Sequence, residues 1–127
     1  MKAKMLMENL IYKNYELILK DIRNICLKEN KDPKNVKVIA ICKRQPFFRI
    51  EQSIKGGITN FGENRIQDAK NRWSKIKSQK IKLSFVGPLQ TNKSEDAVKY
   101  FDDIQSLDRL KLAKSLSNAQ AKLKKKI

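Results

Sequence analysis

Lys43 is the residue of this sequence best placed to do chemistry, because it follows an apolar run and precedes a predicted helix. The run 36–42 reads Val-Lys-Val-Ile-Ala-Ile-Cys, and Pro46 opens the helix. In α/β proteins, reactive side chains gather at the carboxyl ends of buried strands. The neighbouring Arg44, together with partial desolvation, would favour the neutral amine. Schiff-base formation with an aldehyde requires a neutral amine, so this is the chemistry that Lys43 predicts.

Three more polar clusters follow apolar runs in the same way. They are Gly62-Glu63-Asn64, the stretch 87–93 (Gly-Pro-Leu-Gln-Thr-Asn-Lys) and Asp108-Arg109. Gly62 would let the backbone turn tightly and present the next polar side chains at the edge of the sheet. A simpler interpretation is that Glu63 and Asn64 cap the following helix. The stretch 87–93 is the most specific, since a bare turn would need only its Gly-Pro.

Alternating strands and helices are predicted to carry these residues. A first amphipathic helix reaches about Asn30, and its inward face is predicted to hold Ile11, Ile18, Ile22 and Ile25. The predicted strands cover 36–42, 58–61, 81–86 and 104–107. The predicted helices start near Pro46, at Glu63 and at Ser94, a polar linker covers 77–80, and Asp108 caps a last helix to about Lys122. Alternation of this kind predicts parallel strands joined by right-handed crossovers.

The chain length limits which parallel fold is possible. The 127 residues correspond to about one domain. A doubly wound sheet and a barrel both satisfy the alternation, but a flavodoxin-like sheet usually has about five strands and a full barrel about 250 residues. We therefore predict an α/β fold that is the first half of a (β/α)8 TIM barrel, with parallel strands and an N-terminal helix, in a single partial domain covering 1–127.

Composition excludes several kinds of chemistry and partner. The chain has no histidine, so a Ser-His-Asp catalytic triad, a Cys-His catalytic dyad and a histidine-ligated metal site are excluded. Cys26 and Cys42 lack metal-ligand spacing, and we interpret them as reduced core thiols of a cytoplasmic protein. No apolar stretch approaches the roughly 20 residues that cross a bilayer. The net charge of +16 is spread along the chain, so we interpret it as a solvated lysine surface rather than a nucleic-acid face.

Four stretches together resemble a known family. They are Lys43 followed by Pro46, Phe61-Gly-Glu-Asn64 with Gln67 after it, 85–93 (Phe-Val-Gly-Pro-Leu-Gln-Thr-Asn-Lys) and 104–110 (Ile-Gln-Ser-Leu-Asp-Arg-Leu). Their order and spacing resemble the YggS/PROSC family of pyridoxal phosphate homeostasis proteins, and the resemblance extends over roughly residues 8–123. It implies a barrel similar to the N-terminal domain of alanine racemase.

The resemblance also implies a cofactor and its site. Pyridoxal 5'-phosphate would be held as a covalent aldimine on Lys43, with Asn64 beside it. The loop that carries Gln90 and Asn92 would help to shape the mouth of the site, and Ser84 would lie near the cofactor. Members of the family have no established turnover and are thought to buffer and deliver the cofactor. The resemblance therefore implies a binding protein rather than an enzyme.

Two residues and the length depart from the family pattern. Ser84 stands where the family usually has histidine, which removes a possible hydrogen-bond partner of the cofactor, and Arg65 adds a cation near the mouth. Family members are about twice as long, and the later strands of such barrels commonly carry the phosphate site. We expect exposed edges on the first and last strands. We predict a truncated product or one piece of a split gene, with the complementary C-terminal half encoded separately.

Three other functions stay open at this point. A pyridoxal phosphate-dependent racemase-like enzyme would need a positioned acid and base, and no histidine is present to supply one. A non-functional truncated fragment would keep the motifs without the activity. A basic nucleic-acid-binding module is supported by charge alone, and we do not favour it.

Overall fold

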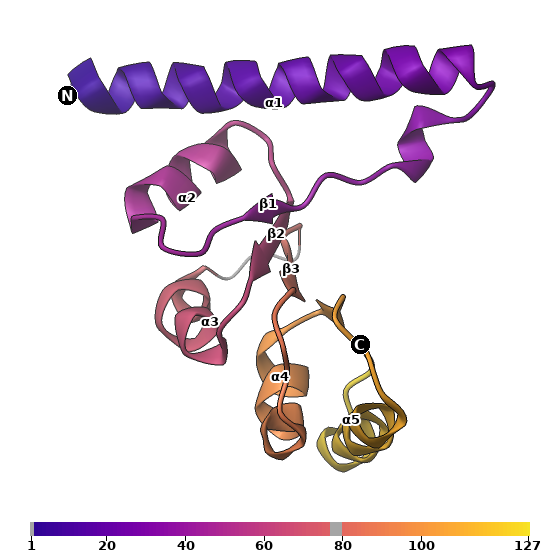
Figure 1. Cartoon of the computed structure of the whole chain (residues 1–127). Helices are drawn as coiled ribbons and strands as arrows, with labels where there is room; N and C mark the ends of the chain where they lie inside the picture. The colour runs from indigo at the N-terminus through magenta and orange to yellow at the C-terminus, as the bar shows by residue number, and fades with distance from the viewer. Residues whose placement is uncertain (1, 77–79) are drawn as a thin grey trace. The chain divides into compact units, whose positions relative to one another are not determined.

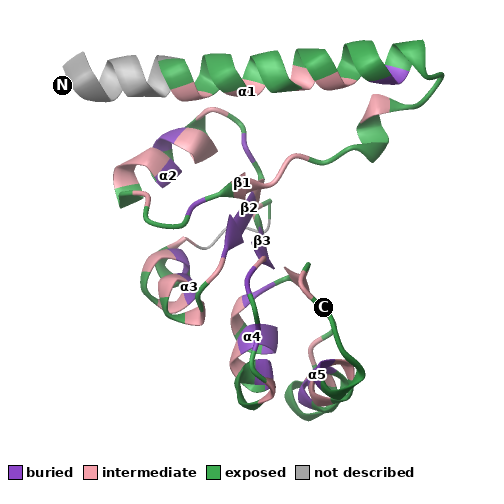
Figure 2. Cartoon of the chain, viewed as in Figure 1, coloured by how far each residue is buried: buried purple, intermediate pink, exposed green. Residues whose placement is uncertain are grey.

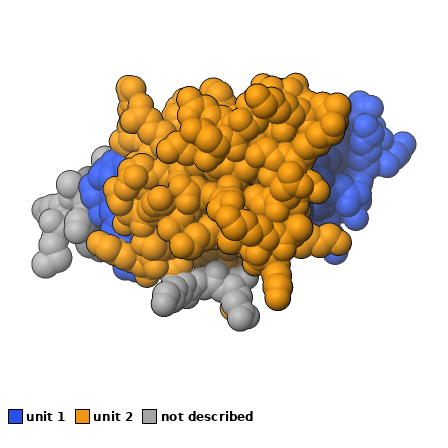
Figure 3. Space-filling model, turned by 90° about the horizontal axis from the view of Figure 1, so that it is seen from below, with its two compact units in different colours: residues 1–38, 45–58 blue, residues 39–44, 59–127 orange. Residues whose placement is uncertain are grey.

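The computed structural model describes residues 2–76 and 80–127, so the predicted linker 77–80 lies outside the described residues except for Lys80. Two compact units divide the chain (Figure 3). Unit 1 contains residues 1–38 and 45–58, and unit 2 contains residues 39–44 and 59–127. The four strands found in the described residues and all the polar clusters of the sequence belong to unit 2, which therefore holds the candidate site.

Unit 1 is helical. It consists of α1 (Lys2–Lys28), a short 3-10 helix (Pro33–Asn35) and α2 (Phe47–Lys55), and α1 packs on α2. The buried or half-buried face of α1 holds Ile11, Tyr15, Leu19, Ile22 and Cys26. Ile18 and Ile25 are 47% and 62% exposed, so the prediction that they share this face is wrong. The apolar stripe of α1 is wider than the face that it buries.

The ends of α2 follow the sequence signals. Pro46 immediately precedes the helix, and its fixed φ suits a helix start. Gly57 follows the helix with φ of +95°, a left-handed conformation that glycine adopts at little cost. In the two stretches that the structure covers, no helix is apolar enough over a sufficient length to cross a membrane.

Unit 2 is built on a parallel sheet of β1 (Ala40–Ile41), β2 (Asn60–Glu63), β3 (Lys82–Phe85) and β4 (Asp103–Ile104). The strands lie in the order β1-β2-β3-β4, which is their order along the chain. The strands of a barrel lie side by side in chain order. In a doubly wound sheet, later strands are placed on both sides of the first strand, so the order does not follow the chain. The predicted α/β fold with parallel strands is confirmed, and β1 and β4 form the two edges of the described sheet.

Three of the strands differ from the sequence expectation, and the predicted strand 104–107 shares only Ile104 with β4 (Asp103–Ile104). The predicted strand 36–42 is reduced to β1, and Val36 and Ile41 are 47% and 45% exposed. As an edge strand, β1 has only β2 as a described neighbour, so it is not covered as a central strand would be. Gly62 lies inside β2 and makes no turn. A Cβ there would lie 2.7 Å from Cδ1 of Ile41, so the glycine leaves space for that side chain.

Helices α3 (Ile66–Arg72), α4 (Ser94–Tyr100) and α5 (Leu110–Leu123) complete unit 2 (Figure 1). α3 packs on β2 and on α4, and α4 packs on α5. Figure 2 shows buried residues along β2 and β3 and on α4 and α5. Asp108 does not cap α5 as predicted. Arg109 occupies the cap position, and its Nη1 donates a hydrogen bond of 2.7 Å to Oδ1 of Asp108.

Aromatic pairs form the centre of this core. The rings of Phe61 and Trp73 lie 4.9 Å apart, and those of Phe85 and Phe101 meet edge to face at 5.1 Å. Trp73 is 7% exposed, so its indole belongs to the core and is not a surface for base stacking. Tilted and edge-to-face pairs of this kind add about 0.5–1.5 kcal/mol to the burial of the rings.

Candidate functional site

The polar clusters meet at the carboxyl edge of the sheet in unit 2. Ile41 pairs with Gly62, and Gly62 pairs with Ser84, so the residues that follow these strands leave the sheet at the same edge. Lys43 follows β1 by two residues, and Asn64 follows β2 directly. Parallel strands bring the residues after their carboxyl ends together, as the sequence predicted.

A cavity of about 290 Å³ lies at this edge and is lined by Lys43, Arg44, Asn64, Arg65 and Asp68. We call it the Lys43 cavity. It joins two residues predicted from the sequence, Lys43 and Asn64, and its volume is near the lower end of small-molecule pockets, roughly 300 Å³. Lys43 is exposed, so the partial desolvation expected for its amine is absent from the described structure. The edge position of β1 explains this exposure.

The Lys43 cavity is rich in positive charge. Arg44 and Arg65 accompany Lys43, and the single carboxylate among the lining residues belongs to Asp68. That carboxylate also forms an ion pair with Arg72, because Oδ2 of Asp68 lies 3.3 Å from Nη2 of Arg72. Arg44 has φ of +60°, a left-handed conformation that costs a non-glycine residue roughly 1–2 kcal/mol. Such strain is concentrated at functional sites.

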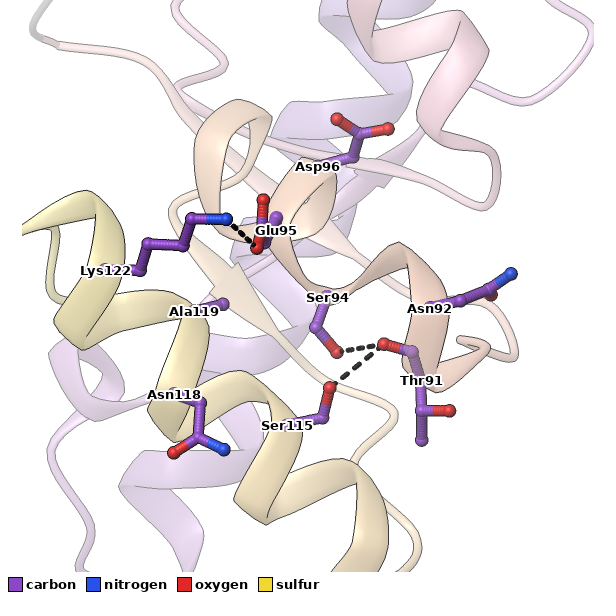
Figure 4. Close-up of a pocket in the computed structure, with 9 residues that line it drawn as sticks. All are labelled: Thr91, Asn92, Ser94, Glu95, Asp96, Ser115, Asn118, Ala119 and Lys122. Atoms are coloured by element: carbon purple, nitrogen blue, oxygen red, sulfur yellow. Dashed lines mark hydrogen bonds and ion pairs between the residues drawn. The ribbon is translucent and has the colours of Figure 1, made fainter.

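Gln90 and Asn92 lie in different places although they share one loop. Gln90 lines a second cavity of about 400 Å³, to which Asn64 and Arg65 also contribute. Asn92 lines a third cavity of about 540 Å³ beside α4 and α5 (Figure 4). Ser84 is 3% exposed within β3 and is not among the residues that line the Lys43 cavity. Of the predicted site residues, the structure thus joins Lys43 to Asn64 and Asn64 to Gln90.

The loop 87–93 contacts the neighbouring strand ends. A Cβ on Gly87 would lie 2.8 Å from the carbonyl oxygen of Asn64, so the glycine allows the two loops to touch. The carbonyl oxygen of Gly87 accepts a hydrogen bond of 2.6 Å from Oγ of Ser106. Nη2 of Arg109 donates to the carbonyl oxygen of Leu89 at 2.7 Å. The Asp108-Arg109 cluster therefore holds the loop in place.

Two serines fix the far end of the same loop. Oγ of Ser94 and Oγ of Ser115 both donate to the carbonyl oxygen of Thr91, at 2.9 and 3.0 Å (Figure 4). Ser94 begins α4 and Ser115 lies on α5, so both helices are tied to the 3-10 turn Thr91–Lys93 that precedes α4. The apolar pattern of α5 could not have indicated this contact.

A buried charged network lies behind the Lys43 cavity. Glu63 ends β2 and is fully buried, so it does not cap α3 as one interpretation of the sequence proposed. Its Oε1 accepts a hydrogen bond of 3.1 Å from Nε1 of Trp73, and its Oε2 lies 3.5 Å from Nη2 of Arg72. Nη1 of Arg72 donates to the carbonyl oxygen of Cys42 at 3.4 Å. Arg72 thus joins β2 and α3 to the peptide that precedes Lys43.

Burial has the largest effect on the pKa of Glu63 and of Cys42 in this network. Desolvation raises the pKa of Glu63, while the hydrogen bond from Trp73 and the charge of Arg72 act in the opposite direction. Burial also raises the pKa of the Cys42 thiol to about 12, with a further contribution from Glu63 and an opposing one from Arg72. The sequence analysis missed Asp68 and Arg72. Their spacing of four on a helix indicates an ion pair, but not its contact with Glu63.

The four described parallel strands, in chain order and with an exposed amine and an amide lining one cavity at their carboxyl edge, define an α/β protein of the barrel type. No protein-family model matches the sequence. A pyridoxal phosphate homeostasis protein of Haemophilus influenzae is 38% identical over 109 residues, which cover 84% of this chain and 46% of that protein. The chain belongs to the family of pyridoxal phosphate homeostasis proteins. It spans about half the length of the curated relatives that it matches.

Solved structures agree with this assignment. PipY of Synechococcus elongatus, whose structure has been solved with pyridoxal phosphate bound, matches with a TM-score of 0.68 and 30% identity. The match covers 81% of this chain and 49% of PipY. A protein of unknown function from Bifidobacterium adolescentis matches with a TM-score of 0.82 and 20% identity, over 94% of this chain and 53% of its own. The second likeness supports the fold alone.

Proposed function

We propose that this chain supplies the lysine of a pyridoxal phosphate site and takes part in intracellular pyridoxal phosphate homeostasis. In this proposal the cofactor is held as a Schiff base on Lys43, and Asn64 lies beside it. The observation that supports it best is that Lys43 and Asn64 line one cavity in a chain whose relatives are named for this cofactor. Gln90 contributes through the adjoining cavity, and Ser84 and Asn92 are assigned by motif position alone.

The residues of the Lys43 cavity fit part of this cofactor. When bound, pyridoxal phosphate supplies an aldehyde that condenses with a primary amine, and Lys43 offers such an amine at an exposed position. Arg44 and Arg65 favour an anionic ligand, and the Asn64 amide can donate and accept hydrogen bonds. The small volume indicates that the described residues form one side of the site rather than the whole.

The proposal includes strands that complete the sheet. β1 and β4 have one described neighbour each, so both present backbone groups that a further strand could pair with. Oδ1 of Asp103, on β4, is buried without a hydrogen-bond partner among the described residues. We propose that residues 1–127 act as the N-terminal half of a barrel, and that further strands pair with these edges and supply the phosphate site.

We propose binding rather than turnover, and a cytoplasmic location. Among the residues that line the Lys43 cavity, Asp68 is the sole acid, and its carboxylate is engaged by Arg72 at 3.3 Å. Both cysteines are free and buried, which agrees with a reducing compartment.

Absorbance and site mapping test the proposal. Pyridoxal phosphate is added to the purified chain, the visible spectrum is recorded, and borohydride reduction is followed by peptide mapping. We expect an absorbance band and a single label on Lys43. Lys43→Arg, which keeps the charge and removes the primary amine, should abolish both. Lys82→Ala is the matched control, because Lys82 is also exposed but lies at the opposite end of its strand.

A label spread over surface lysines, or a band that survives in Lys43→Arg, would contradict the proposal. Binding of a mixed-sequence oligonucleotide, measured against salt, addresses the alternative based on charge. The tail offers little support for that alternative. Lys122 pairs with Glu95 at 2.8 Å, and Nζ of Lys125 donates to the carbonyl oxygen of Phe101 at 2.9 Å.

A further inference from the structure

The buried charged network behind the Lys43 cavity carries a desolvation cost, which points to a role other than stabilising the fold. Glu63 has no exposed surface, and Arg72 is 17% exposed at its side chain. Taking a carboxylate and a guanidinium out of water costs several kcal/mol per ion, and well-packed apolar residues often replace such pairs at no loss of stability. In this chain the pair adjoins the Lys43 cavity, because Arg72 contacts Asp68, which lines that cavity.

Arg72 reaches the cavity by two routes. Its Nη1 donates to the carbonyl oxygen of Cys42, which belongs to the peptide bond that leads into Lys43. Its Nη2 lies 3.3 Å from the carboxylate of Asp68, which lines the cavity with Lys43. The first contact restrains the backbone that carries the amine. The second compensates the negative charge of the one carboxylate that lines the cavity.

Glu63 holds Arg72 in this position from behind. Oε2 of Glu63 lies 3.5 Å from Nη2 of Arg72, while Oε1 is bound by the indole of Trp73. The indole, packed on Phe61, fixes the rotamer of the carboxylate. Arg72 is therefore placed between two carboxylates, one fully buried and one at the cavity.

We propose that Arg72, oriented by Glu63, is a positioning residue that fixes the Lys43 backbone and sets the charge around its amine. This inference rests on the proposed function in one respect, namely that Lys43 is the functional amine of the cavity. The charged groups that line the cavity with Lys43 are Arg44, Arg65 and Asp68. Without Arg72, Asp68 loses its ion-pair partner, so the surroundings of the amine become more negative and its reactivity towards an electrophile falls. Without the charge of Glu63, the surroundings become more positive and that reactivity rises.

Competitive acetylation of the chain without cofactor tests this inference. The chain is treated with a limiting amount of acetic anhydride near pH 8, and the labelling of Lys43 is measured by mass spectrometry relative to that of Lys82. We expect Arg72→Met to lower the relative labelling of Lys43 roughly two- to fivefold, as for one charge nearby. Arg72→Met/Asp68→Asn should restore it. Glu63→Gln should raise it.

The opposite signs separate positioning from a merely structural role, since general loosening of the fold would change the labelling of Lys43 in the same direction in both variants. Glu95→Gln is the control, because it removes the carboxylate of an exposed ion pair with Lys122.

Unchanged labelling in folded Arg72→Met, or no rescue by Asp68→Asn, would overturn the inference. If Arg72→Met does not fold, Glu63→Gln and Arg72→Lys take its place as the test. Lowered labelling of Lys43 in Glu63→Gln would then overturn the inference. Failure of the wild-type chain to bind pyridoxal phosphate would contradict the proposed function and leave this result standing.

Discussion

Gly87 and Asn64 are in such close contact that a Cβ on the glycine would lie 2.8 Å from the carbonyl oxygen of Asn64 and 3.1 Å from its Cβ. This contact joins the end of β2 to the loop after β3. Because the obstructing atom is backbone, it cannot rotate away as a flexible side chain could. The glycine therefore determines how closely the two motifs of the site approach each other.

Gly87→Ala should destabilise the protein by about 1–3 kcal/mol, the usual cost of forcing an extra methyl group into a packed site. The free energy of unfolding in urea, followed by circular dichroism, measures it. Gly56→Ala is the control, because the nearest atom to a Cβ there is 3.4 Å away and φ is −74°. An equal effect of both substitutions would show that the contact with Asn64 is unimportant.

Leu112→Ala should cost about 2–5 kcal/mol, because this side chain of α5 is fully buried and its removal leaves a cavity. Leu110→Ala, two residues earlier on the same helix, should change stability by no more than about 0.5 kcal/mol, since Leu110 is 70% exposed. Urea unfolding of the two variants gives the comparison. Similar losses would mean that α5 is not packed on unit 2 as the structure describes.

Ser115→Ala should cost about 0.5–1.5 kcal/mol, because the carbonyl oxygen of Thr91 loses one of its two serine donors. The loop 87–93 should also exchange its amide hydrogens faster. Ser117→Ala, at an exposed position of the same helix, should be neutral or slightly stabilising, since alanine is the better helix former. Hydrogen exchange that is unaltered in Ser115→Ala would argue against this anchor.

The Cys42 thiol should make stability fall at alkaline pH. Its folded pKa is raised from 9.0 to about 12 by burial, so above pH 9 only the unfolded state releases the proton. The stabilising contribution is complete below pH 9 and is lost as the pH rises towards 12, at up to about 1.4 kcal/mol per pH unit. Unfolding of the wild type and of Cys42→Ala is compared from pH 8 to 10. Parallel stability curves would contradict the prediction.

The chain order of strands and helices could be predicted from the sequence because it is recorded locally. Apolar periodicity marks which residues of an element avoid water, and Pro and Gly mark where α2 begins and ends. The positions of Lys43 and Asn64 at one edge followed from parallel pairing. The family followed from motifs whose order and spacing are properties of the sequence itself.

Tertiary structure decided which of these residues meet and which are covered. Glu63 could be interpreted as a helix cap, yet it is buried against Arg72 and Trp73, which lie nine and ten residues further along, respectively. Gln90 and Asn92 look equivalent in one loop but line separate cavities. The physical reason is that burial and ion pairing depend on distances in space between distant segments, whereas a sequence pattern records only the preferences of each segment.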